Sequence, residues 1–498
     1  MLLGLVVLLA LWYQVKLLDY VEWGDESETI IAARMLASGM HLYSEVFNHH
    51  GPLVFLSGYL LELAGHFSVA SHRVPIAVLQ WLAIFAVYRS PLFSENPDKH
   101  IFLAIIITAM ISLLPGHQLY GHAYIYQVIA GLMVVIIAAH YTLPAIADAR
   151  QLSHARVATG SILIACLPFL AITYLPAAAL LFLCSLRRAS LRWTLACTLA
   201  GLICNVAFLG LIGSFKGYMA YHIYLNAQIL PLYNGGQGIA RLIKNMLSMI
   251  LATAPIESFL SFMGLFIGFA AVADLEKARF PWRSTLLAVA IATLLLRGVE
   301  FHGAAFWYAY IGVMALCLAQ LHLTQKQQLI WQILVLFCVF RLAYPTLVGD
   351  DLLSEKRKES TTFGELAKAI TNKNDRVIAY SFQNFEYLSA DRLPASGDFF
   401  YLPWQEKYNE SPRFGIRINA CDDIKRTEPK LMLIDKWMVF GKYPWDSYAG
   451  CVQGVLDARY RQIPNELIFV RSDYYDRAVA FLALKKKSSL RSALLDAH

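Results

Sequence analysis

The sequence predicts a polytopic α-helical membrane protein of about eleven transmembrane helices, followed by a small C-terminal α/β domain on the extracytoplasmic side. The 498-residue chain is 58% hydrophobic and only 15% charged, with a mean hydropathy of +0.50. These values exclude an ordinary soluble protein. Apolar stretches of membrane-spanning length recur as far as residue 349, and from residue 350 the composition becomes that of a soluble domain. We therefore divide the chain into a transmembrane domain, 1–349, and an α/β domain, 350–498.

The first apolar segment, residues 1–18, has neither a basic n-region nor a small-residue cleavage motif. We interpret it as a retained transmembrane helix rather than a cleaved signal peptide. The formal net charge of +7 is spread over loops and the C-terminal tail. This distribution favours topology signals and contact with the lipid bilayer, and we expect no nucleic-acid partner.

A cluster of ionisable residues follows this segment, within a first extracytoplasmic loop that we place at 19–70. The first half of the stretch Glu22–Pro52 reads as a short helix that Asp25 or Ser27 could cap and that Gly39 could end. Asp25 and Glu26 then lie at its N-terminus, where the helix dipole favours the charged form of Asp25. Residues 43–52 have no clear period, and we expect an ordered loop that returns to the membrane.

Positive charge in the loops sets the expected topology. Residues 53–67 are apolar but too short to span, at about 15 residues, and contain Glu62, so we place them along the membrane surface. Loops 115–123 and 298–304 contain no Lys or Arg, whereas the alternate loops are basic, and the positive-inside rule then puts the former outside. The spans that we expect after the first are 73–88, 101–114, 124–142, two Pro-interrupted helices within 157–186, 193–213, 245–273, 285–297, 305–323 and 329–347.

The second long extracytoplasmic loop, 214–244, is aromatic and Gly-rich. We expect a loop that either lies over a site or simply connects two spans. In the C-terminal domain the pattern predicts an amphipathic helix at 361–372 and strands at 376–381, 430–435 and 467–471.

The sequence does not decide two features of the C-terminal domain, the role of Asp435 and the state of two cysteines. Asp435, at a strand end, is more simply a surface residue that begins a loop than a functional one. Six of the eight cysteines lie in apolar stretches as small fillers, but Cys421 and Cys451 do not. These two could form a disulfide if the domain lies outside the cytoplasm.

The first loop resembles that of GT-C glycosyltransferases. The shared features are the Asp25-Glu26 pair after the first span, an Arg nine residues after the Asp, Ser-Gly, an aromatic residue and a basic-Pro turn. The most similar branches are the protein mannosyltransferase, lipid A aminoarabinose transferase and RgtA-like group. The resemblance implies that Asp25 matches the catalytic carboxylate and Glu26 its acidic neighbour. Glu28 stands where aminoarabinose transferases have Arg, and His50-Gly51-Pro52 replaces Lys-Pro-Pro, which argues against aminoarabinose as the sugar.

Sugar transfer from a lipid phosphate needs a base for the acceptor and charge stabilisation for the departing phosphate. Asp25 is our candidate base, and Glu26 either orients the acceptor or Arg34, or faces water. Arg34 and Arg297 are candidate phosphate ligands because Arg makes bidentate contacts, although each could instead pair with a carboxylate or anchor a helix end. The other candidates for substrate binding are His50, as a hydrogen-bond donor to phosphate, and Tyr43, His49 and His302.

We expect no cofactor. The histidines predicted on the extracytoplasmic side match no zinc-site spacing, so we predict no metal, although Asp25 and Glu26 could complete a site with them. The sequence has no Walker A loop, Rossmann glycine fingerprint or Asp-x-Asp motif, which leaves no support for direct use of a nucleotide sugar.

The predicted function is therefore an inverting membrane glycosyltransferase of a bacterial inner membrane, with its catalytic loops and C-terminal domain in the periplasm. It would take a sugar from a polyprenyl-phosphate carrier to an envelope acceptor: lipopolysaccharide, glycan or lipid, with protein less favoured. The alternatives are a transporter or flippase, or a polymerase of lipid-linked sugars. The predicted span centres are almost free of charge, which favours the enzyme over a transporter.

Overall fold

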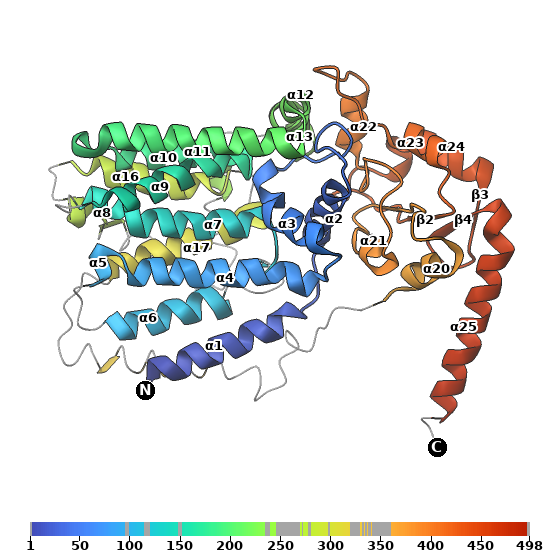
Figure 1. Cartoon of the computed structure of the whole chain (residues 1–498), viewed down its shortest axis with the longest axis horizontal. Coiled ribbons are helices and arrows are strands. Elements are labelled where there is room, and N and C mark those ends of the chain that lie inside the picture. The colour runs from blue at the N-terminus through green and yellow to red at the C-terminus, as the bar shows by residue number, and fades with distance from the viewer. Residues whose placement is uncertain are drawn as a thin grey trace.

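The computed structural model describes residues 2–94, 99–113, 120–147, 152–234, 240–245, 269–270, 272–276, 280–296, 299–318 and 360–495, with isolated residues between 329 and 340. Its helical bundle occupies one side and the C-terminal domain the other (Figure 1). The bundle helices are α1 (Leu2–Leu18), α4 (Val69–Tyr88), α5 (Pro91–Ser94), α6 (Lys99–Thr108) with η2 (Ala109–Leu113), α7 (Tyr126–Ile137) with η3 (Ala138–Thr142) and α8 (Leu143–Ile146), α9 (His154–Cys166), η4 (Leu167–Phe169), η5 (Ile172–Tyr174), α10 (Leu175–Ser185), η6 (Arg188–Ser190), α11 (Leu191–Ile212), α16 (Trp282–Thr293) and α17 (Val299–Leu318).

Three of the described helices are long and apolar enough to cross a membrane: Val69–Tyr88, Tyr126–Ile146 and Arg188–Ile212. Shorter apolar helices in the described part of the bundle include Leu2–Leu18, Lys99–Ile111, His154–Phe169 and Ile172–Ser185. The two helices expected within 157–186 are present as α9 and α10, with a break near Pro168 where the chain is not α-helical. The expected spans 245–273 and 329–347 lie largely outside the described residues, so the count of about eleven stays a prediction.

Small residues allow close packing within the bundle. A Cβ on Gly131 of α7 would lie 2.9 Å from the backbone Cα of Ala305 in α17, closer than carbon atoms approach. These two helices therefore meet almost backbone to backbone, as membrane helices do when a small residue lies at the contact.

The first loop forms a layer between the bundle and the C-terminal domain (Figure 1). It contains α2 (Gly24–Ala37), η1 (Pro52–Phe55) and α3 (Leu56–Ala64). The predicted helix is present, and Gly39 follows it with a φ of +94°. The predicted cap is wrong: extended Trp23 precedes the helix, no side chain caps it, and the Glu26 N–H bonds the Trp23 carbonyl at 2.8 Å.

The stretch expected to be a second long loop is mostly helical. It forms α12 (Phe215–Gly217), η7 (Tyr218–Ile229) and α13 (Leu230–Asn234), with a further helical piece at 240–245. These helices were not predicted, and the position of 214–244 as an extracytoplasmic segment between two spans stays a prediction. Its side chains contact other segments: Asn226, for example, donates to the carbonyl of His49 at 2.7 Å.

The C-terminal domain has one four-stranded sheet in the order β1-β2-β4-β3. Strand β1 pairs in parallel with β2, with Ile378 opposite Met432, and β4 is antiparallel to both β2 and β3. The strands are β1 (Ile378–Tyr380), β2 (Leu431–Ile434), β3 (Tyr460–Gln462) and β4 (Ile468–Arg471), and the helices are α20 (Thr362–Ile370), α21 (Phe385–Ala390), α22 (Pro403–Asn409), α23 (Ala420–Thr427), η8 (Trp445–Ser447), α24 (Gly450–Arg459), η9 (Ser472–Tyr474) and α25 (Tyr475–Leu495).

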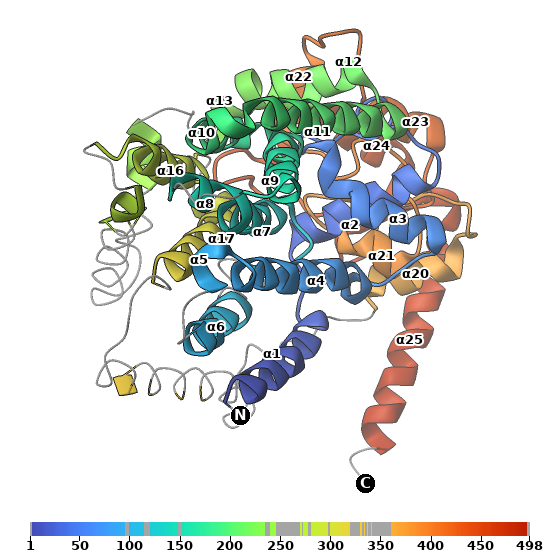
Figure 2. The same ribbon diagram turned by 60° about the vertical axis from the view of Figure 1, so that its left-hand side comes forward.

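The predicted helix and all three predicted strands are present in this domain, and β3 is additional. Both faces of β1 and β2 are buried, as expected for short apolar strands within an α/β domain. A disulfide joins Cys421 of α23 to Cys451 of α24, so the pairing that the sequence left open occurs. Helix α25 extends beyond the rest of the domain in both views (Figures 1 and 2).

Candidate active site

A cavity of about 440 Å³ lies where the first loop meets the C-terminal domain. Both parts of the chain contribute to it. On the side of the bundle it is lined by Trp23, Gly24, Asp25, Glu28, His49, His50, Tyr126 and Leu230. On the side of the domain it is lined by Ser381, Phe382, Gln383, Trp404, Asp435, Trp437 and Phe440.

The pitch of α2 determines which of its carboxylates reach this cavity. Asp25 and Glu28 are three residues apart and therefore lie on one face of the helix. Both line the cavity, and Asp25 is half-buried there. Glu26 is turned by about 100° from Asp25, because a helix has about 3.6 residues per turn. Of the two acidic residues predicted to be catalytic, only Asp25 lines the cavity.

Glu26 instead forms a buried ion pair with Arg73 of α4. Arg73 donates from Nε at 2.9 Å and from Nη2 at 2.6 Å, and the Tyr124 N–H donates to the same carboxylate at 2.9 Å. The exposed fraction of the Arg73 side chain is 1% and that of Glu26 is zero. Arg73 also donates to the carbonyls of Leu17, in α1, at 3.0 Å and of Tyr20 at 2.7 Å. The ion pair thus connects α1, α2 and α4, and the geometry gives Glu26 a structural role.

The segment before Pro52 places two histidines on the cavity wall. His50 Nδ1 lies 3.5 Å from Glu28 Oε1, and Asn48 Nδ2 donates to the same oxygen at 2.8 Å. The rings of His49 and His50 are 4.3 Å apart between centroids, and Tyr126 lies 4.5 Å from His50 on the bundle side. The two histidines and Glu28 therefore form one polar group beside Asp25.

Contacts on the far side of this segment hold it in place. The Gly51 N–H donates to the carbonyl of Leu170 at 2.9 Å. A Cβ on Gly51 would lie 2.0 Å from the carbonyl oxygen of Phe169, so only glycine fits there. Tyr43 is fully buried and donates from its hydroxyl to the carbonyl of His50 at 2.5 Å. Burial and the nearby Tyr218 raise the pKa of Tyr43 well above its usual value, so the phenol stays neutral. Tyr43 thus orients the histidine segment and is not among the residues that line the cavity.

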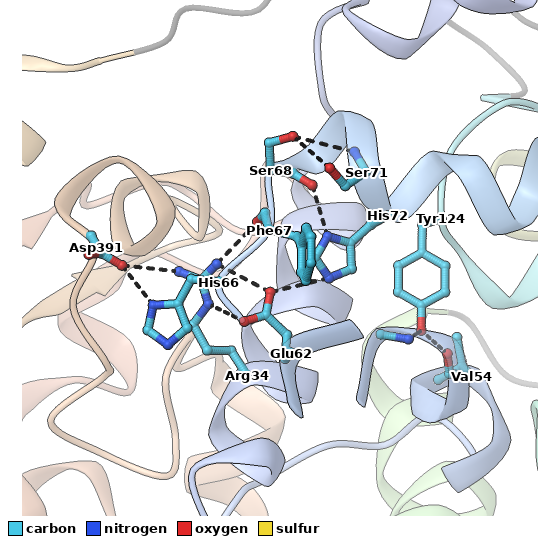
Figure 3. Close-up of polar contacts among 11 residues, drawn as sticks. Arg34, Val54, Glu62, His66, Phe67, Ser68, Ser71, His72, Tyr124 and Asp391 are labelled. Atoms are coloured by element: carbon cyan, nitrogen blue, oxygen red, sulfur yellow. Dashed lines mark hydrogen bonds and ion pairs between the residues drawn. The ribbon is translucent and has the colours of Figure 1, made fainter. Parts of the chain in front are cut away.

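Arg34 is not among the residues that line the cavity. It lies beside Glu62, Phe67 and Asp391 (Figure 3). It donates to Glu62 of α3 from Nε at 2.9 Å and from Nη2 at 3.2 Å, and to the carbonyl of Phe67. Burial alone would raise the pKa of Glu62, but hydrogen bonds from His72 and Arg34 outweigh it and hold that pKa below its ordinary value. The sequence suggested that Arg34 could bind phosphate or pair with a carboxylate. The geometry favours pairing with a carboxylate.

The remaining candidate residues are not among the described residues that line the cavity. Arg297 lies outside the described residues, and His302 is in α17 but its side chain is not described. His122 is fully buried and packs its ring against Tyr20, 5.1 Å between centroids. Within the described ranges, no three His, Cys, Asp or Glu side chains gather as a metal site would require.

The domain side of the cavity was largely missed from the sequence. Asp435 follows β2 directly and accepts a hydrogen bond from Gln383 Nε2 at 3.0 Å. The sequence favours a plain surface position, but Asp435 lines the cavity that also contains Asp25. The available signal was its place at the carboxyl end of a parallel strand, where α/β domains commonly bind ligands. The aromatic residues Trp404, Trp437 and Phe440 gave no such signal.

Comparison with known proteins identifies the fold. No family model and no curated protein matches the sequence. ArnT from Cupriavidus metallidurans, solved with undecaprenyl phosphate bound, aligns with a TM-score of 0.56 and 12% identity over 94% of this chain and 97% of that chain. ArnT is a GT-C superfamily glycosyltransferase. This chain has the GT-C fold.

A second GT-C structure, the apo oligosaccharyltransferase of Archaeoglobus fulgidus, aligns over 95% of this chain and 75% of that chain, with a TM-score of 0.47 and 13% identity. The GT-C fold predicted from the first loop is thus confirmed by the alignment with ArnT, which covers nearly all of both chains. At this level of identity the likeness concerns the fold, and the roles of individual residues rest on the geometry described above.

Proposed function

We propose that this chain is an integral membrane glycosyltransferase that moves a sugar from a polyprenyl-phosphate carrier onto a cell-envelope acceptor. The observation that carries the proposal is a half-buried carboxylate, Asp25, in a cavity between the helical bundle and the C-terminal domain of a GT-C fold. A lipid-borne donor would approach from the bundle side. The acceptor would then be a lipopolysaccharide, glycan or lipid at the periplasmic face of a bacterial inner membrane, with protein less favoured.

Asp25 acts as the general base in this proposal. It takes the proton of the acceptor hydroxyl or amine as that atom bonds to the anomeric carbon. The bond between the anomeric carbon and the phosphate oxygen breaks on the opposite side, and the oxygen leaves with the electron pair. The phosphate needs little acid assistance, and the configuration at the anomeric carbon inverts. The products are the glycosylated acceptor and the polyprenyl phosphate.

His50 is the proposed phosphate ligand. It lines the cavity beside Asp25, and Glu28 lies 3.5 Å from its Nδ1. A carboxylate at this distance stabilises the protonated imidazole, which can donate to a phosphate oxygen. Arg34 is not needed in this role, because it is already bonded to Glu62.

Native mass spectrometry of the detergent-released protein tests the proposal. We expect the wild type to carry polyprenyl phosphate, the product, and Asp25→Asn to carry an adduct heavier by one glycosyl residue, because the donor binds but is not consumed. His50→Ala should lose both adducts. His41→Ala is the matched control, since His41 lies in the same loop with 61% of its side chain exposed, and it should behave as the wild type.

Two outcomes would contradict the proposal. The same glycosylated adduct on the wild type and on Asp25→Asn would indicate that the protein carries a lipid-linked sugar without cleaving it, as a transporter or flippase does. A lipid diphosphate adduct would indicate a polymerase of lipid-linked sugars instead.

A further inference from the structure

The domain side of the cavity presents an aromatic wall made by Trp404, Trp437 and Phe440. The rings of Trp404 and Phe440 are stacked, with centroids 5.9 Å apart and 18° between their planes. Trp437 meets Phe440 edge to face at 6.2 Å. Trp437 and Phe440 are 37% and 40% exposed, which is unusual for aromatic residues held in fixed contact with one another. Flat apolar surface is therefore available inside the cavity.

Polar groups lie next to this wall. Asp435 is half-buried and accepts from Gln383 Nε2 at 3.0 Å, so a carboxylate and an amide stand side by side at the cavity. Trp404 is 3% exposed, and its indole N–H has no hydrogen-bond acceptor among the described residues. A buried indole N–H normally has an acceptor, so this group points to a ligand oxygen.

The backbone of the wall is also unusual. Ser381, Phe382 and Phe440 line the cavity with left-handed φ values of 63°, 61° and 53°. Residues other than glycine adopt this region at an energetic cost, and such residues cluster at ligand sites. Here the conformation is held by contacts: the Ser381 N–H donates to the Phe400 carbonyl at 3.3 Å, and Phe382 stacks on Phe400.

We propose that this aromatic wall, with Asp435 and Gln383, is a carbohydrate-binding subsite that holds a pyranose unit of the acceptor. The apolar C–H face of the sugar lies on Trp437 and Phe440, and its hydroxyl groups bond Asp435 and Gln383. A site of aromatic rings with a few convergent hydrogen-bonding groups suits a ligand that is apolar on its faces and polar at its edges. A lipid tail would use only the rings and would leave the carboxylate without a role.

The charge of the lining residues restricts the kind of sugar that the subsite can bind. Among the described residues that line the cavity there is no Lys or Arg, whereas Asp25, Glu28 and Asp435 all face it. An acidic sugar or a phosphorylated one would meet these carboxylates without a counter-charge on the domain side. The subsite therefore takes a neutral sugar or an amino sugar.

The position of the subsite relative to the histidines explains how the acceptor would be aligned. The His49 ring lies 6.4 Å from the Trp404 ring, so the donor-side histidines and the aromatic wall adjoin. An acceptor on the wall has Asp25 on the same cavity surface, in position to take its proton. The identification of the bound sugar as part of the acceptor rests on the proposed function. The binding of a sugar to the aromatic wall can nevertheless be measured without turnover.

The test is glycan-array binding by the detergent-purified full-length chain, followed by calorimetry with the strongest ligand. The array carries neutral, amino and acidic oligosaccharides. We expect binding to neutral sugars, amino sugars or both. Trp437→Ala and Asp435→Ala should each weaken that binding by about tenfold or more, the factor that corresponds to about 1.4 kcal/mol. Met438→Ala is the control, because Met438 is in the same segment and 50% exposed but does not line the cavity.

The inference is overturned if the wild type binds no glycan, if it prefers acidic glycans, or if Trp437→Ala and Asp435→Ala bind as the wild type does. Polyprenyl-phosphate adducts are measured on the same preparations. Loss of glycan binding with these adducts retained would refute the subsite alone. Glycan binding without any polyprenyl-phosphate adduct would support the subsite and refute the proposed donor.

Discussion

Replacing Glu26 by Ala should destabilise the protein strongly, although Glu26 does not reach the cavity. The substitution removes three hydrogen bonds, two from Arg73 and one from the Tyr124 N–H. It also leaves the Arg73 guanidinium, which is 1% exposed, without the carboxylate to which it is hydrogen-bonded, although Glu22 and Asp19 still act on it from further away. Breaking a buried ion pair by removing one partner costs about 3–5 kcal/mol. We therefore expect a loss of that size in the free energy of unfolding.

The assay is reversible unfolding of the purified protein in mixed micelles, followed by tryptophan fluorescence. The control is Asp25→Asn, the adjacent half-buried carboxylate, which should change the unfolding free energy by less than about 1 kcal/mol. The double variant Glu26→Leu with Arg73→Met should recover much of the lost stability, since replacing both partners removes the unpaired charge.

The reasoning is refuted if Glu26→Ala unfolds like the wild type, or if the double variant is no more stable than Glu26→Ala. If Glu26 were catalytic, its replacement would instead abolish activity at unchanged stability.

The remaining predictions concern other parts of the junction and the domain. The depressed pKa of Glu62 means that its ion pair stabilises the fold above the ordinary value of 4.5, and that this contribution is lost as the pH falls below it. The melting temperature should therefore fall more steeply with acidification in the wild type than in Glu62→Gln. Cys421→Ser opens a disulfide with a sequence separation of 30 and should lower the stability of the domain by roughly 2–4 kcal/mol relative to the disulfide-bonded wild type, and the reduced wild type should resemble the variant. Gly51→Ala brings a Cβ onto the Phe169 carbonyl and should weaken polyprenyl-phosphate binding more than Gly4→Ala, where nothing lies within 4 Å.

Much of the fold follows from local patterns in the sequence. Apolar stretches marked the bundle helices, prolines marked the break between α9 and α10, and short apolar runs marked β1, β2 and β4. These features depend on periodicity and length, which neighbouring residues determine. The helices within 215–234 were not predicted, because an aromatic and Gly-rich composition shows no clear helical period, whereas tertiary hydrogen bonds such as that of Asn226 help to hold this segment in place.

The candidate site could be predicted only in part. The sequence selected Asp25 as the base, a role that stays a prediction, and Asp25 lines the cavity. Helical spacing alone could have separated Asp25 and Glu28 from Glu26. The partner of Arg34 could not be predicted, because Glu62 is 28 residues away and meets it only after α3 packs on α2. Asp435 reaches the cavity because the domain is docked on the first loop, a placement that no local pattern encodes.

Intact envelope glycans and lipids, compared by mass spectrometry, test the central claim most directly. The cells carry the wild type, no protein, or Asp25→Asn at a matched level in the membrane. The account predicts that one glycosyl mass disappears both in the deletion and in Asp25→Asn. If Asp25→Asn retains that mass while the deletion loses it, Asp25 is not the base and the proposed mechanism is contradicted.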